Sequence, residues 1–167
     1  AKWGYTDAQK AEGGYAWKIT LRDDLKWDDG TAITAAETGH TVIATMHTKG
    51  SGNAIDRVID CFSESQQSQI RFQLATVLRT VVSQQMIPDK AGNMIPVFEI
   101  MHINNAIRNM IRDNKNHQID NAIASGSREG MISMDQAILQ LYREGQISRE
   151  TAVHYSEKPE LLKRQIQ

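Results

Sequence analysis

Residues 35–62 read AAETGHTVIATMHTKGSGNAIDRVIDCF, and this stretch decides the fold that the sequence predicts. Thr41–Met46 is a short apolar run rich in β-branched residues, which predicts a strand buried on both faces. A polar turn follows over residues 47–53, and apolar residues at helical spacing then predict an amphipathic helix. These apolar residues are Ile55, Val58, Ile59 and Phe62. Because α/β proteins often bind phosphate where such a loop enters a helix, this is the first place to look for a site.

The composition is that of one globular domain. The chain has 167 residues, 40% of them hydrophobic, and a formal net charge of −1. The nearly balanced charge gives no reason to expect a nucleic-acid partner, and no apolar run approaches the roughly 20 residues that a membrane-spanning helix needs. The single cysteine fits a reducing compartment. All three tryptophans lie within the first 27 residues and all seven methionines at or after Met46, which suggests that two sequences of different origin are joined.

The remainder of the chain predicts mainly helices. An apolar stripe predicts one long helix that opens at Ser65 and stops at Pro88. A turn of hairpin type at 89–93 then precedes a strand over Ile95–Met101. Four short helices are expected after it, two of them with caps at Ser133 and Ser148.

Several motifs in one order resemble the PilT family of type IV pilus retraction ATPases. They are AAETGH, the hydrophobic run ending in HT, IDRVID, and AIRNMIRD at Ala106–Asp113. The resemblance covers about residues 35–155 and implies an α/β fold: part of a RecA-like motor domain, followed by a helical C-terminal region. It assigns His47 and Thr48 to the His box, which senses the terminal phosphate of the nucleotide. It assigns a role in retraction to Ala106, Ile107, Arg108, Asn109, Arg112 and Asp113.

Two readings of these residues stay open. His47 could instead be a neutral histidine hydrogen-bonded to backbone, and Arg108 and Arg112 could form a solvated cationic face. The five histidines and one cysteine are not spaced as metal ligands, so no metal site is predicted.

The phosphate-binding half of such a motor is not evident in the sequence. The motif G-x-x-x-x-G-K-[ST] does not occur, and in Lys49–Asn53 the lysine precedes the glycines instead of following them. This order argues against catalytic phosphate binding there and leaves weak anion binding at the helix start open. We therefore predict no cofactor for this chain and no ATP hydrolysis by it alone, although the parent family uses ATP and Mg.

A second resemblance lies near the start of the chain. WKITLRDDLKWDDGTAITA, within Tyr15–Ala35, resembles a scaffold segment of the extracellular peptide-binding proteins of ABC transporters. This predicts a chimera joined near Thr34–Ala36, with a foreign hairpin over 1–35 and the motor portion over 36–167. The alternatives are a fragment of a peptide- or solute-binding module, or an inactive structural relic.

The resemblance to pilus motors also carries expectations about location and partners. The motor portion implies a cytoplasmic protein, and the parent family forms hexameric rings at the pilus base. A truncated sheet would expose a strand edge, so we expect a homodimer, which a swapped Tyr15–Leu21 strand could form.

Overall fold

The computed structural model describes residues 31–166, with side chains from Ile33 onward. The expected strand at Tyr15–Leu21 and most of the segment that resembles a peptide-binding protein lie outside the described residues. The first described helix, α2, runs over Thr31–Glu37 and crosses the expected join at Thr34–Ala36 without interruption.

Helices make up most of the described chain. Those before the sheet are α3 (Ser51–Asp60) and α4 (Glu64–Val77). The strands are β1 (Thr80–Pro88) and β2 (Met94–His102). After them come α5 (Asn105–Arg112), α6 (Ile119–Ser125), α7 (Met134–Arg143), α8 (Arg149–Tyr155) and α9 (Pro159–Gln165), with short 3₁₀ turns at Asn116–Gln118 and Ser127–Glu129.

The two strands form one antiparallel hairpin. Thr80 pairs with His102, Ser83 with Glu99, and Pro88 with Met94. The predicted strand at Ile95–Met101 and the hairpin-type turn are therefore confirmed, as is the α/β class of the fold.

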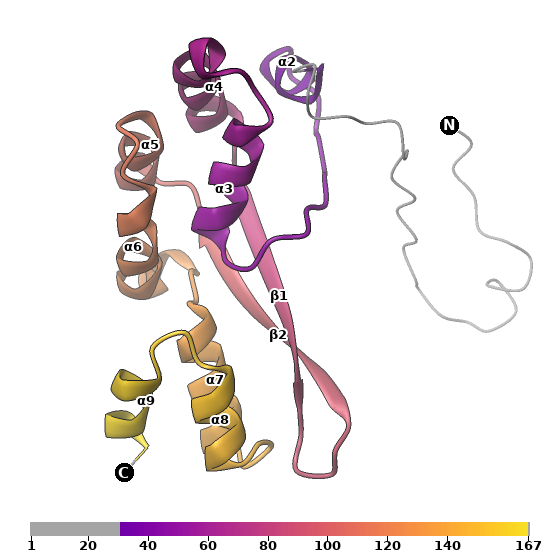
Figure 1. Ribbon diagram of the computed structural model, residues 1–167, viewed down its shortest axis with the longest axis vertical. Coiled ribbons are helices and arrows are strands. Elements are labelled where there is room, and N and C mark those ends of the chain that lie inside the picture. The colour runs from indigo at the N-terminus through magenta and orange to yellow at the C-terminus, as the bar shows by residue number, and fades with distance from the viewer. Residues whose placement is uncertain (1–30, 167) are drawn as a thin grey trace, which may run out of the picture.

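The helices pack along the hairpin in two groups (Figure 1). We call the first core the cluster formed by α2–α6 with Met101 of β2. The second core is formed by α7–α9 with Ile87 of β1 and Val97 of β2, nearer the hairpin turn. Val97, Glu99 and Met101 alternate along β2 and point inward, so Glu99 lies on the same strand between the two cores.

The predicted strand at Thr41–Met46 is wrong. These residues carry no strand assignment, and the side chains of Val42 and Ile43 are 39% and 58% exposed. A β-strand is stabilised by hydrogen bonds to a neighbouring strand, and the described residues pair none with this segment. The apolar run is therefore extended but unpaired.

The predicted long helix from Ser65 to Pro88 is correct only in its first half. Helix α4 ends at Val77, and the residues after it form β1. Val81 and Val82 fit a helical stripe and also an alternating strand, so periodicity left the choice open. Pairing along the whole of β2 decides it in favour of a strand.

The C-terminal region is helical, as predicted, but contains five α-helices instead of four. Ser133 and Gln136 form the expected capping box, and Ser148 accepts a hydrogen bond from the backbone N–H of Thr151. Pro159 is the first residue of the additional helix, α9, a position that proline tolerates well.

Candidate functional site

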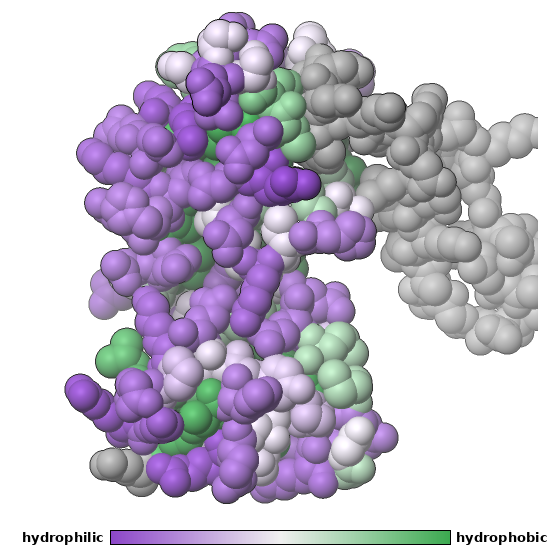
Figure 2. All heavy atoms as spheres, viewed as in Figure 1, coloured by the Kyte–Doolittle hydropathy of each residue, from purple (hydrophilic) through white to green (hydrophobic). Residues whose placement is uncertain are grey.

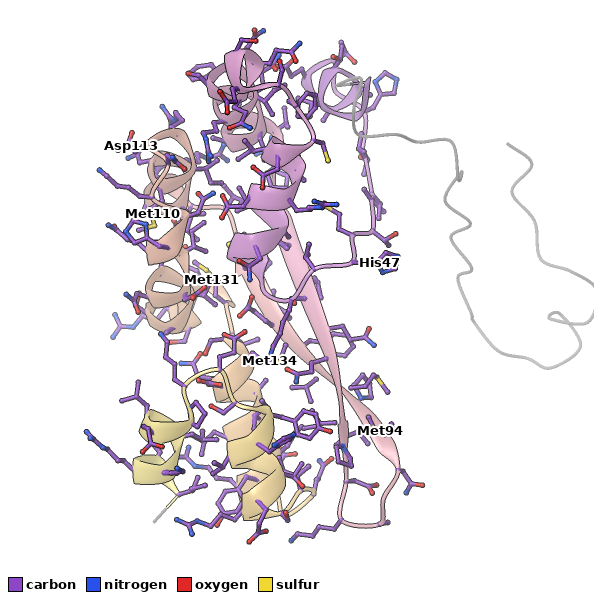
Figure 3. The ribbon with its side chains drawn as sticks, viewed as in Figure 1. His47, Met94, Met110, Asp113, Met131 and Met134 are labelled. Atoms are coloured by element: carbon purple, nitrogen blue, oxygen red, sulfur yellow. The ribbon has the colours of Figure 1, made fainter. Side chains whose placement is uncertain are left out.

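His47 and Thr48 lie in the loop that leads into α3. His47 is exposed, Thr48 is half-buried, and Figure 3 shows His47 pointing away from the helices. Within the described part of the chain, its imidazole has no hydrogen bond to backbone, unlike the buried structural histidine that the sequence left open. The ring is thus free to meet a group outside this structure.

The start of α3 is held by two side chains of the hairpin. Gly50 donates its backbone N–H to Ser83 Oγ at 3.0 Å. Ser51 donates its backbone N–H and its hydroxyl to Glu99 Oε1, at 2.8 and 2.7 Å. The carboxylate is 2% exposed and the serine fully buried. Free N–H groups at a helix start attract anions, and here the protein's own carboxylate takes that place.

The same carboxylate also contacts a second helix. Glu99 Oε2 accepts a hydrogen bond from the backbone N–H of Met134, the first residue of α7, at 3.4 Å. One buried side chain therefore bridges the first turns of α3 and α7. These donors offset the cost of burying its charge.

The surroundings of this helix start are acidic. Burial raises the pKa of Glu157, and the nearby carboxylates of Glu99, Asp120 and Asp135 raise it further, against the opposing effect of Lys49. A phosphate group would meet both this negative field and the occupied helix start. Both features oppose the weak anion binding at Lys49–Asn53 that the sequence leaves open.

Helix α5 carries AIRNMIRD and directs its arginines toward α4. Arg108 Nη1 donates to the backbone carbonyls of Ala75 and Thr76, at 2.7 and 3.1 Å. The Arg112 guanidinium lies 5.9 Å from the centre of the Phe72 ring. The two side chains do not form a single solvated cationic face, because the first caps the C-terminal end of α4 and the second stacks on its side.

The rest of the motif divides into a buried and an exposed face. Ile107 and Ile111 are fully buried in the first core. Ala106, Asn109 and Asp113 are exposed, and Asp113 forms an ion pair with Lys115 at 3.1 Å. Figure 3 places Asp113 and His47 on opposite sides of α3, so the structure does not bring the two motifs together.

Sequence reasoning missed Glu99 and Ser83. The available signal was an acidic residue at an inward position of an alternating strand, between Val97 and Met101. A buried carboxylate needs donors, so such a position predicts a polar contact inside the fold.

Two properties of the described residues bear on other classes of function. Between residues 31 and 166, no three His, Cys, Asp or Glu side chains gather as metal ligands would. No helix in the same range has both the length and the apolar character needed to cross a bilayer.

Comparison with known proteins assigns the chain to a family. The family model described as "Type II/IV secretion system protein" matches residues 29–156. The chain is 39% identical over 132 residues to the "Twitching motility protein" of Neisseria gonorrhoeae, covering 78% of this chain and 35% of that protein. It is 40% identical over 129 residues to the "Type IV pilus retractation ATPase PilT" of Pseudomonas aeruginosa, covering 77% and 38%. A solved structure, "Crystal Structure of the Pilus Retraction Motor PilT and Bound ADP", matches with a TM-score of 0.68 and 38% identity, covering 80% of this chain and 37% of the other.

The chain therefore belongs to the Type II/IV secretion system protein family, and its fold is part of a RecA-like ATPase domain. Its similarity within that family is to PilT-type pilus motors, which supports the fragment of a motor that the sequence motifs predict. The chain spans a little over a third of the length of these relatives.

Proposed function

We propose that this chain is the nucleotide-responding part of a type IV pilus retraction motor of the cytoplasm. One observation carries the proposal: His47 is exposed in a loop that leads directly into an anchored helix, in a chain similar to pilus retraction ATPases. In this proposal, His47 contacts the terminal phosphate of a nucleotide that other parts of the motor hold. Helix α5 passes the response to neighbouring subunits or to the base of the pilus.

The chain alone is not expected to hydrolyse ATP. It contains no G-x-x-x-x-G-K-[ST] motif, and the start of α3 is occupied by Glu99. Nucleotide and Mg bound by other parts of the motor would supply the phosphoryl chemistry. The residues of this chain would respond to the bound nucleotide.

We further propose that the chain forms a homodimer. Only two strands pair in the described residues, so the outer edge of β1 lacks a strand partner there, and the outer edge of β2 has only the isolated bridge between Ile100 and Ile132. Such an edge can pair with a second chain. The resemblance to pilus motors implies a family that forms rings, which is compatible with self-association.

The test is to graft residues 36–155 into the matching place of the Pseudomonas aeruginosa relative and to measure its ATPase activity. We expect the graft to hydrolyse ATP and His47→Ala within it to lower kcat by roughly a hundredfold, as the loss of one transition-state contact does. The matched control is His117→Ala, which alters another exposed histidine. An equal effect of the two changes would contradict the role of His47. ATP hydrolysis by the 167-residue chain alone would contradict its predicted inactivity.

A further inference from the structure

Glu99 occupies a position that the pilus-motor motifs do not include. It is 2% exposed, it lies between the two cores on β2, and it accepts hydrogen bonds from the starts of two helices that belong to different cores. A carboxylate has two oxygens that can accept from opposite sides, and here each oxygen serves one helix.

The contact fixes the direction in which the chain enters α3. Gly50, directly before the helix, has φ +83°, a conformation that side chains other than glycine rarely adopt. Its N–H is held by Ser83, the cross-strand partner of Glu99. The pair of side chains therefore fixes two consecutive backbone N–H groups, only three and four residues after His47.

The contact at the other oxygen connects this loop to the second core. Met134 is the first residue of α7, and the next residue, Asp135, accepts hydrogen bonds from Ser156, Glu157 and Lys158 in the connection between α8 and α9. A shift of α7 would therefore displace Glu99 and, through it, the residues that lead into α3.

We propose that Glu99 is the positioning residue of the His47 loop and couples the position of this loop to the helices α7–α9. Ser83 assists it by holding Gly50. The meaning of the coupling rests on the proposed function, in which His47 responds to nucleotide. The coupling itself is a property of the nucleotide-free chain.

Glu99→Gln separates the two contacts without changing the size of the side chain. An amide has one accepting oxygen and an NH₂ group that only donates, so it cannot accept from both Ser51 and Met134. One of the two N–H groups then loses its partner. The matched control is Glu64→Gln, which removes an exposed carboxylate from the first turn of α4.

The measurement is NMR of the 167-residue chain without nucleotide. For Glu99→Gln we expect the amide of Ser51 or Met134 to exchange with solvent roughly ten- to a hundredfold faster, as the loss of a hydrogen bond to a charged group predicts. The imidazole signals of His47 should move, and those of His154 on α8 should stay. Glu64→Gln should leave His47 unchanged.

A merely structural role for Glu99 gives a different result. In that case exchange would accelerate evenly through both cores, His47 and His154 would shift alike, and the proposal would be overturned. If Glu99→Gln does not fold, Ser83→Ala can replace it, because this change removes only the acceptor of the Gly50 N–H. Ser83→Ala should still move the His47 signals and should leave the Met134 amide unchanged. Unmoved His47 signals would overturn the proposal. If His47→Ala does not change the activity of the grafted ATPase, the proposed function is contradicted, but the positioning role of Glu99 measured by NMR is not affected.

Discussion

Arg108 and Arg112 lie four residues apart on α5 and make contacts of different strength. Arg108 donates two hydrogen bonds to the last carbonyls of α4, whereas Arg112 stacks on Phe72, whose side chain is 59% exposed. Carbonyls at a helix end have no partner within the helix, so the first contact satisfies groups that the fold would otherwise leave unpaired. The second contact is open to water and contributes less.

At this scale we predict that Arg108→Ala lowers the free energy of unfolding by about 1–3 kcal/mol, the usual cost of losing hydrogen bonds to a charged group. The matched change Arg112→Ala should cost only about 0.5–1 kcal/mol, as for an exposed cation–π contact. Urea denaturation of both variants measures the difference. Equal losses would show that Arg108 does not act as the cap of α4.

For Glu99, the sequence predicts the position of the residue but not its contacts. Its inward position was readable from the alternation of β2, but its two partners were not, because Ser51 and Met134 lie 48 and 35 residues away in the chain. The resemblance alone assigned His47 and Thr48 to the His box, whereas the exposure of His47 follows from the loop in which the fold places it.

At the scale of elements, the hairpin depends on its turn. Asp89 Oδ1 accepts the backbone N–H groups of Ala91 and Asn93, each at 2.8 Å, and Oδ2 accepts from the Asn93 side chain at 3.1 Å. The hydrogen bond from the Asn93 side chain is the largest of the effects that lower the pKa of Asp89. The ionised form therefore organises the turn between β1 and β2.

The sign of the pH dependence follows from this lowered pKa. The folded hairpin binds a proton at Asp89 less readily than the unfolded chain does, so the stabilisation is complete above the ordinary carboxylate pKa and is lost as pH falls through the lowered folded value. We predict that Asp89→Ala speeds amide exchange in the turn at neutral pH and removes this local pH dependence. Asp60→Ala, at an exposed aspartate that ends α3, should do neither. An unchanged turn in Asp89→Ala, followed by NMR, would contradict the prediction.

At the scale of the whole molecule, the outer face of the hairpin carries exposed apolar side chains. They include Val82, Met86, Met94 and Phe98, which are 58%, 41%, 52% and 41% exposed. The face of the molecule shown in Figure 2 is mostly hydrophilic, with hydrophobic areas of small extent. Apolar groups gathered on one sheet face favour association.

We predict that the chain forms a homodimer and that Phe98→Ser weakens it, because the change removes an apolar side chain from this face. Phe72→Ser, at a similarly exposed phenylalanine on α4, is the matched control and should leave association unchanged. Light scattering over a range of concentrations measures the mass. A mass of one chain at the highest concentration would contradict the homodimer.

The sequence by itself determined the elements whose signals are local. The amphipathic face of α3 and the caps at Ser133 and Ser148 were predicted because neighbouring residues alone create them. Family membership was likewise readable from motifs in order. Only the tertiary structure decided that Val81 and Val82 belong to a strand and that Thr41–Met46 does not, since strand formation depends on a partner far away in the chain. It also decided that a carboxylate of β2, Glu99, accepts the hydrogen bond from the backbone N–H of Ser51 at the start of α3, since this partner lies far away in the chain.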